Sequence, residues 1–328
     1  MDVILHIDSL RCGYRNSHQN IYVPKALISS FLQIPLLIAL IGKNGTGKST
    51  LLRTLSGLQK PLEGNILLNK KNINKYTIND RSKILSFLPS QNAKIPYIKV
   101  KEYVSLGKSN SFFKFHKKQK DVYETLSYLQ LEHKAENFLT QLSDGEMQRT
   151  AIAKVIFQDS SIMIFDEPLS HLDPKQQLNI LSLFFNLVKE QQKTIIFSTH
   201  LTDIVLKYAH KIWLITEDSF IEKIPEQIII DKDLEKNELK IETNEYLPFS
   251  RITKCCVRII GDGVSFKYTK YAFLRYGIKT YCNKNVIFSV IIQQNNNGNY
   301  SWLLKKENVI IKEFNKLEDI IVYLMQNL

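Results

Sequence analysis

The segment GKNGTGKST, from Gly42 to Thr50, constrains this chain most, because it fits the pattern G-x-x-x-x-G-K-[ST]. An apolar run over 34–41 precedes it, as expected for a strand buried on both faces of a parallel sheet. The residues that follow, STLLRTLSGL, carry apolar side chains at helical spacing. A chance glycine-rich turn would lack these flanks. Strand, turn and helix in this order predict a loop whose backbone N–H groups surround the phosphates of a nucleotide.

Two side chains of this loop are predicted to carry most of its chemistry. Lys48 supplies a point charge at the β- and γ-phosphates, and Ser49 offers a hydroxyl to Mg²⁺. The predicted ligands are therefore ATP and Mg²⁺. The expected ATP contacts come from the whole loop: Gly42, Lys43, Asn44, Gly45, Thr46, Gly47, Lys48, Ser49 and Thr50.

A pair of carboxylates ends a second buried strand. Residues 161–165, SIMIF, lead directly into Asp166 and Glu167. Asp166 is expected to support Mg²⁺ through water, and Glu167 to polarise the attacking water. Two adjacent carboxylates also fit a solvated turn, but another buried strand follows at 193–198, after a helix near 176–187. Strands that alternate with helices predict an α/β fold.

Two shorter motifs accompany these strands. LSDGE, from Leu142 to Glu146, precedes a helix that begins MQRTAIAKVIF, so its Ser and Gly lie at an anion-binding helix N-terminus. By itself LSDGE is ordinary turn and capping chemistry. STH places His200 after the strand over 193–198, although a lone histidine is more often structural. Each motif gains weight from its position in the set.

The order of the phosphate loop, LSDGE, IMIFDEP, SHLD and STH resembles the nucleotide-binding subunit of ABC transporters, over residues 1 to about 235. The resemblance implies a RecA-like P-loop core with a helical subdomain at about 92–157. It implies that Glu167 is the catalytic carboxylate, that His200 senses the γ-phosphate, that Asp173 couples the two sites of a dimer and that Tyr14 stacks on adenine. It also implies a signature element that contacts the partner subunit's γ-phosphate, formed by Ser143, Asp144, Gly145 and Glu146.

The sequence departs from the family pattern at several positions. The commonest family signature is LSGGQ, so LSDGE adds Asp144 and Glu146 beside a phosphate-binding element, where they would repel ATP unless Asp144 points away. Ser170 and His171 stand where small residues are commoner. The magnesium-contacting glutamine is expected near FLPSQ. Gln91 is the predicted ligand, and a one-residue shift in register would place Ser90 there instead.

The composition changes from about residue 231, where DKDLEKNELKIETNE is charged and free of aromatic residues, as in a linker. Beyond it, CCVRIIGDG, NVIFSVIIQQ and YSWLLKK are typical of strands, and YTKYAFLRYG and LEDIIVYLMQNL of helices. We therefore predict an ABC ATPase domain over 1–235 and a small C-terminal α/β domain over 236–328. The second domain has no catalytic set, and both a regulatory role and a packing role are open to it.

The net charge is +12, from 44 Lys and Arg against 32 Asp and Glu. These basic residues are scattered, without a stripe threaded by aromatic residues, so we expect no nucleic-acid partner. The N-terminus lacks the pattern of a signal peptide, and the strongest apolar run is far shorter than the roughly 20 residues that a membrane span needs. We expect a peripheral protein at the cytoplasmic face of the cell membrane, with reduced cysteines that lack metal-ligand spacing.

Three functions compete. The segment 87–109 resembles importers for siderophore-iron, haem and cobalamin, which implies the ATP-hydrolysing subunit of an importer. Its implied partners are a second copy, membrane permease subunits and, indirectly, a substrate-binding protein. The alternative is a soluble ABC ATPase that acts on a ribosome, DNA or Fe–S assembly partner. The single P-loop and the absence of sustained heptads before LSDGE argue against it. The presence of both Glu167 and His200 argues against a scaffold without turnover.

Overall fold

The computed structural model describes residues 5–15, 20–32, 35–90, 97–108, 121–239, 255–280, 287–295, 298–307 and 309–327. The chain forms two compact units, Met1–His200 with Trp213–Glu222 and Leu201–Ile212 with Lys223–Leu328. The predicted boundary between the two domains lies near residue 235. Residues 223–235 instead group with the C-terminal unit, because Ile224 and Ile230 pack in its hydrophobic core.

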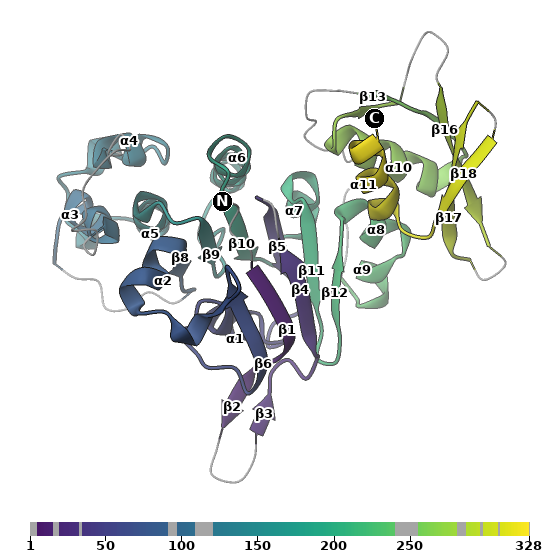
Figure 1. Cartoon of the computed structure of the whole chain (residues 1–328). Coiled ribbons are helices and arrows are strands. Elements are labelled where there is room, and N and C mark those ends of the chain that lie inside the picture. The colour runs from purple at the N-terminus through teal and green to yellow at the C-terminus, as the bar shows by residue number, and fades with distance from the viewer. Residues whose placement is uncertain are drawn as a thin grey trace. The chain divides into compact units, whose positions relative to one another are not determined.

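A six-stranded sheet with the order β12-β11-β5-β10-β9-β8 organises the N-terminal unit (Figure 1). Four of its strands are parallel neighbours: β5 (Leu37–Ile41), β10 (Thr194–Ser198), β9 (Ile162–Phe165) and β8 (Leu85–Leu88). The strands β11 (Lys211–Ile215) and β12 (Phe220–Lys223) complete it. All residues of β5, β9 and β10 are buried, as in a parallel sheet covered on both faces. The predicted α/β fold is confirmed.

A second, antiparallel sheet has the order β4-β1-β6-β7. Its strands are β1 (Leu5–Arg11), β4 (Ile28–Leu32), β6 (Glu63–Leu68) and β7 (Lys71–Asn72). The strands β2 (Gly13–Arg15) and β3 (Asn20–Tyr22) form a separate antiparallel pair. The apolar side chains of this sheet share one core with β5 and with α1 (Lys48–Leu55). That core supports the helix that begins inside the phosphate-binding loop.

The remaining α-helices in the described part of this unit are α2 (Ile78–Ile84), α3 (Val100–Ser105), α4 (Val122–Ser127), α5 (Asp144–Gln158) and α6 (Pro174–Gln191). Figure 1 shows α3, α4 and α5 grouped on one side of the parallel sheet, in the region predicted as the helical subdomain. On α6, Phe184 stacks on Phe165 with ring centroids 4.6 Å apart and meets the edge of Phe197. This contact fixes α6 against β9 and β10.

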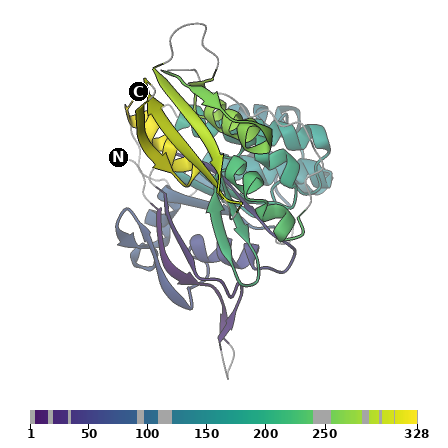
Figure 2. The same ribbon diagram turned by 90° about the vertical axis from the view of Figure 1, so that its right-hand side faces the viewer.

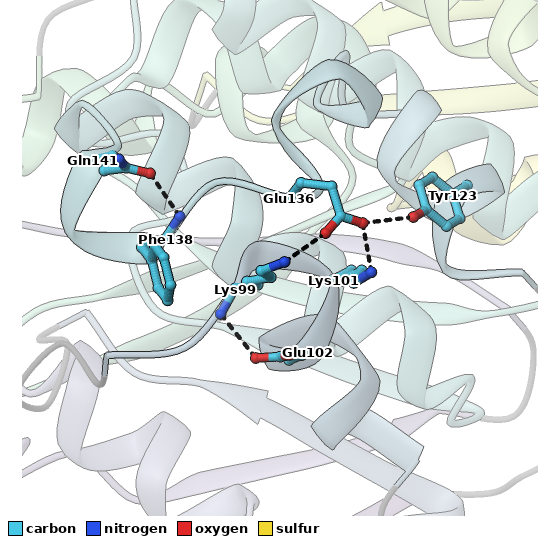
Figure 3. Close-up of polar contacts among 7 residues, drawn as sticks. All are labelled: Lys99, Lys101, Glu102, Tyr123, Glu136, Phe138 and Gln141. Carbon is cyan, nitrogen blue, oxygen red and sulfur yellow. Dashed lines mark hydrogen bonds and ion pairs between the residues drawn. The ribbon is translucent and has the colours of Figure 1, made fainter.

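A surface network around Glu136 ties the helical group together (Figure 3). The Glu136 carboxylate accepts hydrogen bonds from Lys99 Nζ (2.8 Å), Tyr123 Oη (3.1 Å) and Lys101 Nζ. The two lysines lower the pKa of Glu136 to about 2. Glu102 accepts from the Lys99 backbone N–H at 3.0 Å. Because these groups are largely exposed, the network orients α3 and α4 more than it stabilises them.

The C-terminal unit is built on a four-stranded sheet with the order β14-β16-β17-β18, drawn in green to yellow in Figure 2. Its strands are β14 (Arg258–Ile260), β16 (Phe288–Gln294), β17 (Tyr300–Lys306) and β18 (Val309–Phe314). A small parallel pair joins β13 (Cys255–Cys256) to β15 (Ile278–Lys279). Its helices are α7 (Thr202–Tyr208), α8 (Pro225–Ile230), α9 (Asp233–Lys236), α10 (Gly263–Arg275) and α11 (Leu317–Asn327).

This unit has a hydrophobic core of its own, centred on Trp302 and Phe273. The Trp302 indole N–H donates to Thr269 Oγ1 at 2.8 Å, so the polar edge of the buried ring is satisfied. The sequence predicted β13, β14, β16, β17, α10 and α11 of this region, but not β15, β18, α7 or α8. It was wrong at α9, which lies in the segment predicted to be a linker. The expectation of reduced cysteines was wrong for Cys256, which is disulfide-bonded, whereas Cys12 is a free, buried thiol.

Candidate functional site

Three motifs meet where the carboxyl ends of adjacent parallel strands lie side by side. The phosphate-binding loop follows β5, Asp166 follows β9, and Ser198 ends β10. In the register of the sheet, Ser198 pairs with Leu40 and Phe197 pairs with Phe165. Ligands in open α/β sheets bind at such an edge. The topology therefore brings together residues that are more than 100 positions apart in the sequence.

The loop between β5 and α1 requires glycine at Gly47. This residue is the N-cap of α1 and has φ +98°, in the left-handed region that favours glycine. A Cβ atom at Gly47 would lie 2.6 Å from the backbone nitrogen of Pro24. At Gly45, φ is +84° and an added Cβ would meet nothing within 4 Å. Gly47 therefore permits close packing against Pro24, and Gly45 permits the turn of the loop.

Backbone carbonyl groups of this loop hold the side chain of Lys48 in place. The buried Lys48 ammonium donates to the carbonyl oxygens of Gly42 at 2.8 Å and of Lys43 at 2.9 Å. Burial lowers the pKa of Lys48, and the negative charges of Glu167 and Asp166 oppose that shift. The ammonium is thus fixed within the field of both carboxylates. Ser49 lies half-buried in the first turn of α1.

Ser198 links the two carboxylate residues, a role that sequence reasoning missed. Its hydroxyl donates to Asp166 Oδ1 at 2.7 Å and accepts from the Glu167 backbone N–H at 2.8 Å. Ser198 and Asp166 are both fully buried. The motif STH contained the only signal in the sequence, and a serine at a strand end does not reveal which partner it reaches.

The surroundings of the second carboxylate oxygen of Asp166 indicate whether a magnesium ion fits this site. Asp166 Oδ2 is buried and has no hydrogen-bond partner among the described residues. A buried ionised oxygen without a partner is costly, and a hydrated cation removes that cost. Among the described residues no group of three or more His, Cys, Asp or Glu could hold a metal directly. Asp166 therefore fits a cation that is bound through water and also held by other oxygen donors.

The Glu167 backbone is strained. Its φ of +51° lies in the left-handed region, which side chains other than glycine rarely adopt. The Glu167 carbonyl accepts hydrogen bonds from Ser170 Oγ at 2.8 Å and from Gln148 Nε2 at 3.3 Å. Strain of this kind persists where surrounding bonds over-determine a conformation, commonly at functional sites. These bonds hold the half-buried Glu167 side chain at the end of β9.

The signature segment forms a reciprocal cap at the start of α5. Ser143 Oγ accepts from the Glu146 backbone N–H at 3.3 Å, and Glu146 Oε2 accepts from the Ser143 backbone N–H at 2.9 Å and from its hydroxyl at 3.1 Å. Lys134 lies 3.2 Å from Glu146 Oε1. The Ser143 N–H, together with Lys134, lowers the pKa of Glu146.

This cap accounts for one of the two extra carboxylates in LSDGE. Glu146 is committed to the helix cap and to Lys134, so its charge is largely compensated within the chain. Asp144 is exposed in the first turn of α5, where a negative charge is favourable to the helix dipole. A Cβ atom at Gly145 would lie 3.1 Å from the His171 carbonyl oxygen, so the segment packs closely on SHLD.

The other predicted site residues occupy distinct positions. Asp173 caps α6, where its Oδ1 accepts from the Gln176 N–H at 2.9 Å. His200 is exposed just beyond β10. The exposed Tyr14, on β2, is hydrogen-bonded through its hydroxyl to Thr50 Oγ1 at 3.1 Å, which places it beside α1. Gln91 lies outside the described residues and Ser90 is exposed, so the glutamine register stays a prediction.

The described helices include none with both the length and the apolar character needed to cross a membrane. The ABC transporter family profile matches residues 33–170. A probable siderophore transport system ATP-binding protein of Bacillus subtilis, YusV, is 32% identical over 68% of this chain and 81% of its own length. A petrobactin import ATP-binding protein of Bacillus anthracis, FpuD, is 30% identical over 69% of this chain and 82% of its own.

Solved structures give the same result. A putative metal-chelate type ABC transporter in an inward-facing conformation matches with a TM-score of 0.58 and 28% identity, over 71% of this chain and 88% of its own. The cbiO1 component of a Clostridium perfringens ABC transporter complex matches with a TM-score of 0.58 and 29% identity, over 72% of this chain and 94% of its own. With the site geometry and the sequence matches, this establishes that the chain belongs to the ABC transporter ATP-binding protein family.

Proposed function

We propose that this ATPase powers the import of a siderophore or a similar metal chelate through a separate membrane permease. The observation that carries the proposal is the meeting of Lys48, Asp166 and Glu167 at one sheet edge, in a chain similar to siderophore and petrobactin import proteins. Haem and cobalamin are further cargoes of the importer class that the sequence resembles. The protein acts at the cytoplasmic face of the membrane, with permease subunits and, indirectly, a substrate-binding protein as partners.

ATP binds with its phosphates in the loop from Gly42 to Thr50, where Lys48 faces the β- and γ-phosphates. Tyr14 stacks on the adenine ring. Ser49 and Asp166 would hold Mg²⁺, Asp166 through water, with Gln91 as a further donor. When bound, Mg²⁺ neutralises charge on the phosphate oxygens. The unpartnered oxygen of Asp166 supports this assignment.

Hydrolysis depends on positioning and on electrostatic stabilisation of the phosphoryl oxygens. Glu167 orients and polarises the attacking water, a contribution of about 10²–10⁴-fold. His200 contacts the γ-phosphate from the end of β10. Ser198 supports the reaction by fixing both Asp166 and the Glu167 backbone.

Two copies bind ATP head to tail in this proposal. Each copy presents its signature segment, Ser143, Asp144, Gly145 and Glu146, to the γ-phosphate bound by the other. Asp173 couples the two sites. The γ-phosphate then bridges the copies, so ATP closes the dimer and ADP releases it, which drives the permease. No nucleic acid takes part.

The test compares Glu167→Gln with Lys48→Ala. Glu167→Gln is expected to bind ATP normally, to lose about 10²–10⁴-fold in turnover and to form an ATP-dependent dimer by light scattering. Lys48→Ala is expected to lose ATP affinity, because a charge contact to phosphate is removed. Normal turnover in Glu167→Gln would remove that residue from its role. Copurification of the wild type with nucleic acid and not with membranes would overturn the transport assignment.

A further inference from the structure

Arg275, the last residue of α10, is almost completely buried, and its guanidinium group donates hydrogen bonds to the backbone of α7. Its Nη2 donates to the Leu206 carbonyl at 2.8 Å, and its Nη1 donates to the carbonyls of Lys207 at 3.2 Å and Ala209 at 2.9 Å. Its Nε donates to Glu226 Oε1 at 2.9 Å. These three carbonyls lie at the C-terminal end of α7.

The arrangement is a cap on α7. The last carbonyls of a helix have no partner within the helix, and a cation there is favoured by the helix dipole. Arg275 satisfies both conditions from α10, and the fully buried Glu226 on α8 balances its charge. A second tie holds the same segment, because Lys211 lies 3.0 Å from Glu318 on α11. Residues 201–212 therefore belong structurally to the C-terminal unit.

The C-terminal unit has a source of cohesion besides this arginine. The unit has an apolar core around Trp302 and Phe273, and a buried ion pair is commonly matched in stability by apolar residues of similar size. Three of the hydrogen bonds described above run from Arg275 to carbonyl oxygens at the end of α7, and the fourth runs to Glu226. One effect of Arg275 is therefore to fix where α7 lies against α10.

The position of α7 matters because of what precedes it. The helix begins at Thr202, so only Leu201 separates it from His200. A displacement of the helix is passed to the His200 backbone through one intervening residue. The C-terminal unit thus holds the element directly attached to the residue assigned to the γ-phosphate.

We propose that Arg275 is a positioning residue for ATP hydrolysis: by clamping α7, it lets the C-terminal domain set the placement of His200 and hence the turnover rate. The inference rests on the proposed function, because that proposal assigns His200 to the γ-phosphate. It gives the domain a regulatory role, since any partner that shifts α10 against α7 changes turnover without touching ATP.

The experiment uses the full chain with the paired substitution Arg275→Met and Glu226→Gln, which removes both buried charges and leaves neither unpaired. We expect kcat to fall, by about 10²-fold if His200 is displaced by about 1 Å, with ATP affinity unchanged because the P-loop is intact. Arg275→Lys keeps the charge beside Glu226 but cannot span three carbonyls, and it is expected to show a smaller loss. It serves as the test if the paired variant does not fold.

Thr269→Val is the matched control. It removes the Trp302 hydrogen bond inside the same unit without touching α7, so it is expected to lower the unfolding temperature and to leave kcat unchanged. The inference also requires that the Arg275 substitutions have no additional effect on kcat in a His200→Ala background.

Two results would overturn the inference: an unchanged kcat in the Arg275 variants, or a loss that Thr269→Val or the His200→Ala background reproduces in full. If Glu167→Gln and Lys48→Ala behave as expected while the Arg275 variants turn over normally, only this inference fails. If Glu167→Gln and His200→Ala turn over normally, the proposed site itself fails.

Discussion

Ser198→Ala is the sharpest test of how this site is held together. The substitution deletes one oxygen atom that serves two residues: it donates to Asp166 Oδ1 at 2.7 Å and accepts from the Glu167 N–H at 2.8 Å. Both Ser198 and Asp166 are fully buried, so bulk water cannot replace the hydroxyl without a structural change. Asp166 would then lose the one hydrogen bond that its side chain makes among the described residues.

The expected loss of stability follows from these two bonds. A hydrogen bond to a charged group contributes about 1.5–3 kcal/mol, and an unsatisfied buried N–H costs about 1–3 kcal/mol. Because part of each contribution is recovered by relaxation, we expect the free energy of unfolding to fall by about 3 kcal/mol. For a unit of this size the unfolding temperature should then fall by about 6–12 °C.

In Ser198→Ala, kcat should fall by more than the loss of folded protein accounts for. Glu167 keeps its carboxylate but loses the anchor of its strained backbone, and a misplacement of the order of 1 Å typically reduces a rate by about 10²-fold. The assay measures kcat with Mg-ATP below the unfolding temperature, alongside ATP affinity, which should be unchanged. Ser86→Ala is the control, since Ser86 is buried in β8 and pairs with Ser160 at 2.7 Å. Equal turnover in Ser198→Ala and Ser86→Ala would refute the reasoning.

Three further predictions concern the loop, the signature and the glutamine. Gly47→Ala should abolish ATP binding measured by titration calorimetry, whereas Gly45→Ala, with open space around its Cβ, should retain a measurable part; equal loss would contradict the packing argument. The pKa of Glu146 is lowered by folding, so its ionised form stabilises the protein above the unfolded pKa of about 4.3 and this contribution is lost as the pH falls through the folded value. The difference in unfolding temperature between wild type and Glu146→Gln should therefore shrink below about pH 4, and a constant difference would exclude the cap. Gln91→Ala should reduce Mg-dependent turnover while Ser90→Ala leaves it unchanged, and the reverse result would shift the register by one residue.

The parallel sheet was predictable because its strands are apolar throughout. Runs such as SIMIF ending in Asp166 identify both a buried strand and a polar edge. The antiparallel sheet was not predicted. In β1 the register shifts between Asp8 and Arg11, which breaks the alternation, and in β4 a polar residue, Ser30, is buried. A strand that violates period two carries little signal in sequence.

The site shows the same division between local and tertiary information. The phosphate loop and the carboxylates are local sequence motifs, so their chemical roles can be predicted from their residue types. The partners that hold them come from elsewhere: Ser198 lies 32 residues from Asp166, and Lys134 pairs with Glu146 across the helical group. Nothing near Arg275 in the sequence indicates that it reaches α7, 66 to 69 residues earlier. Such pairings exist only once the chain is folded.

The cap on α5 has a consequence for how two copies would separate. The Ser143 proton already has an acceptor in Glu146 Oε2. In the proposed dimer, a phosphate oxygen from the other copy must compete with that carboxylate for the same proton. Association therefore exchanges one charge-assisted bond for another, and the net gain is the difference between two acceptors. Once the γ-phosphate leaves, the Ser143 hydroxyl donates to Glu146 again. The Glu146 carboxylate of each copy therefore competes with the γ-phosphate for the hydrogen bond that joins the two copies.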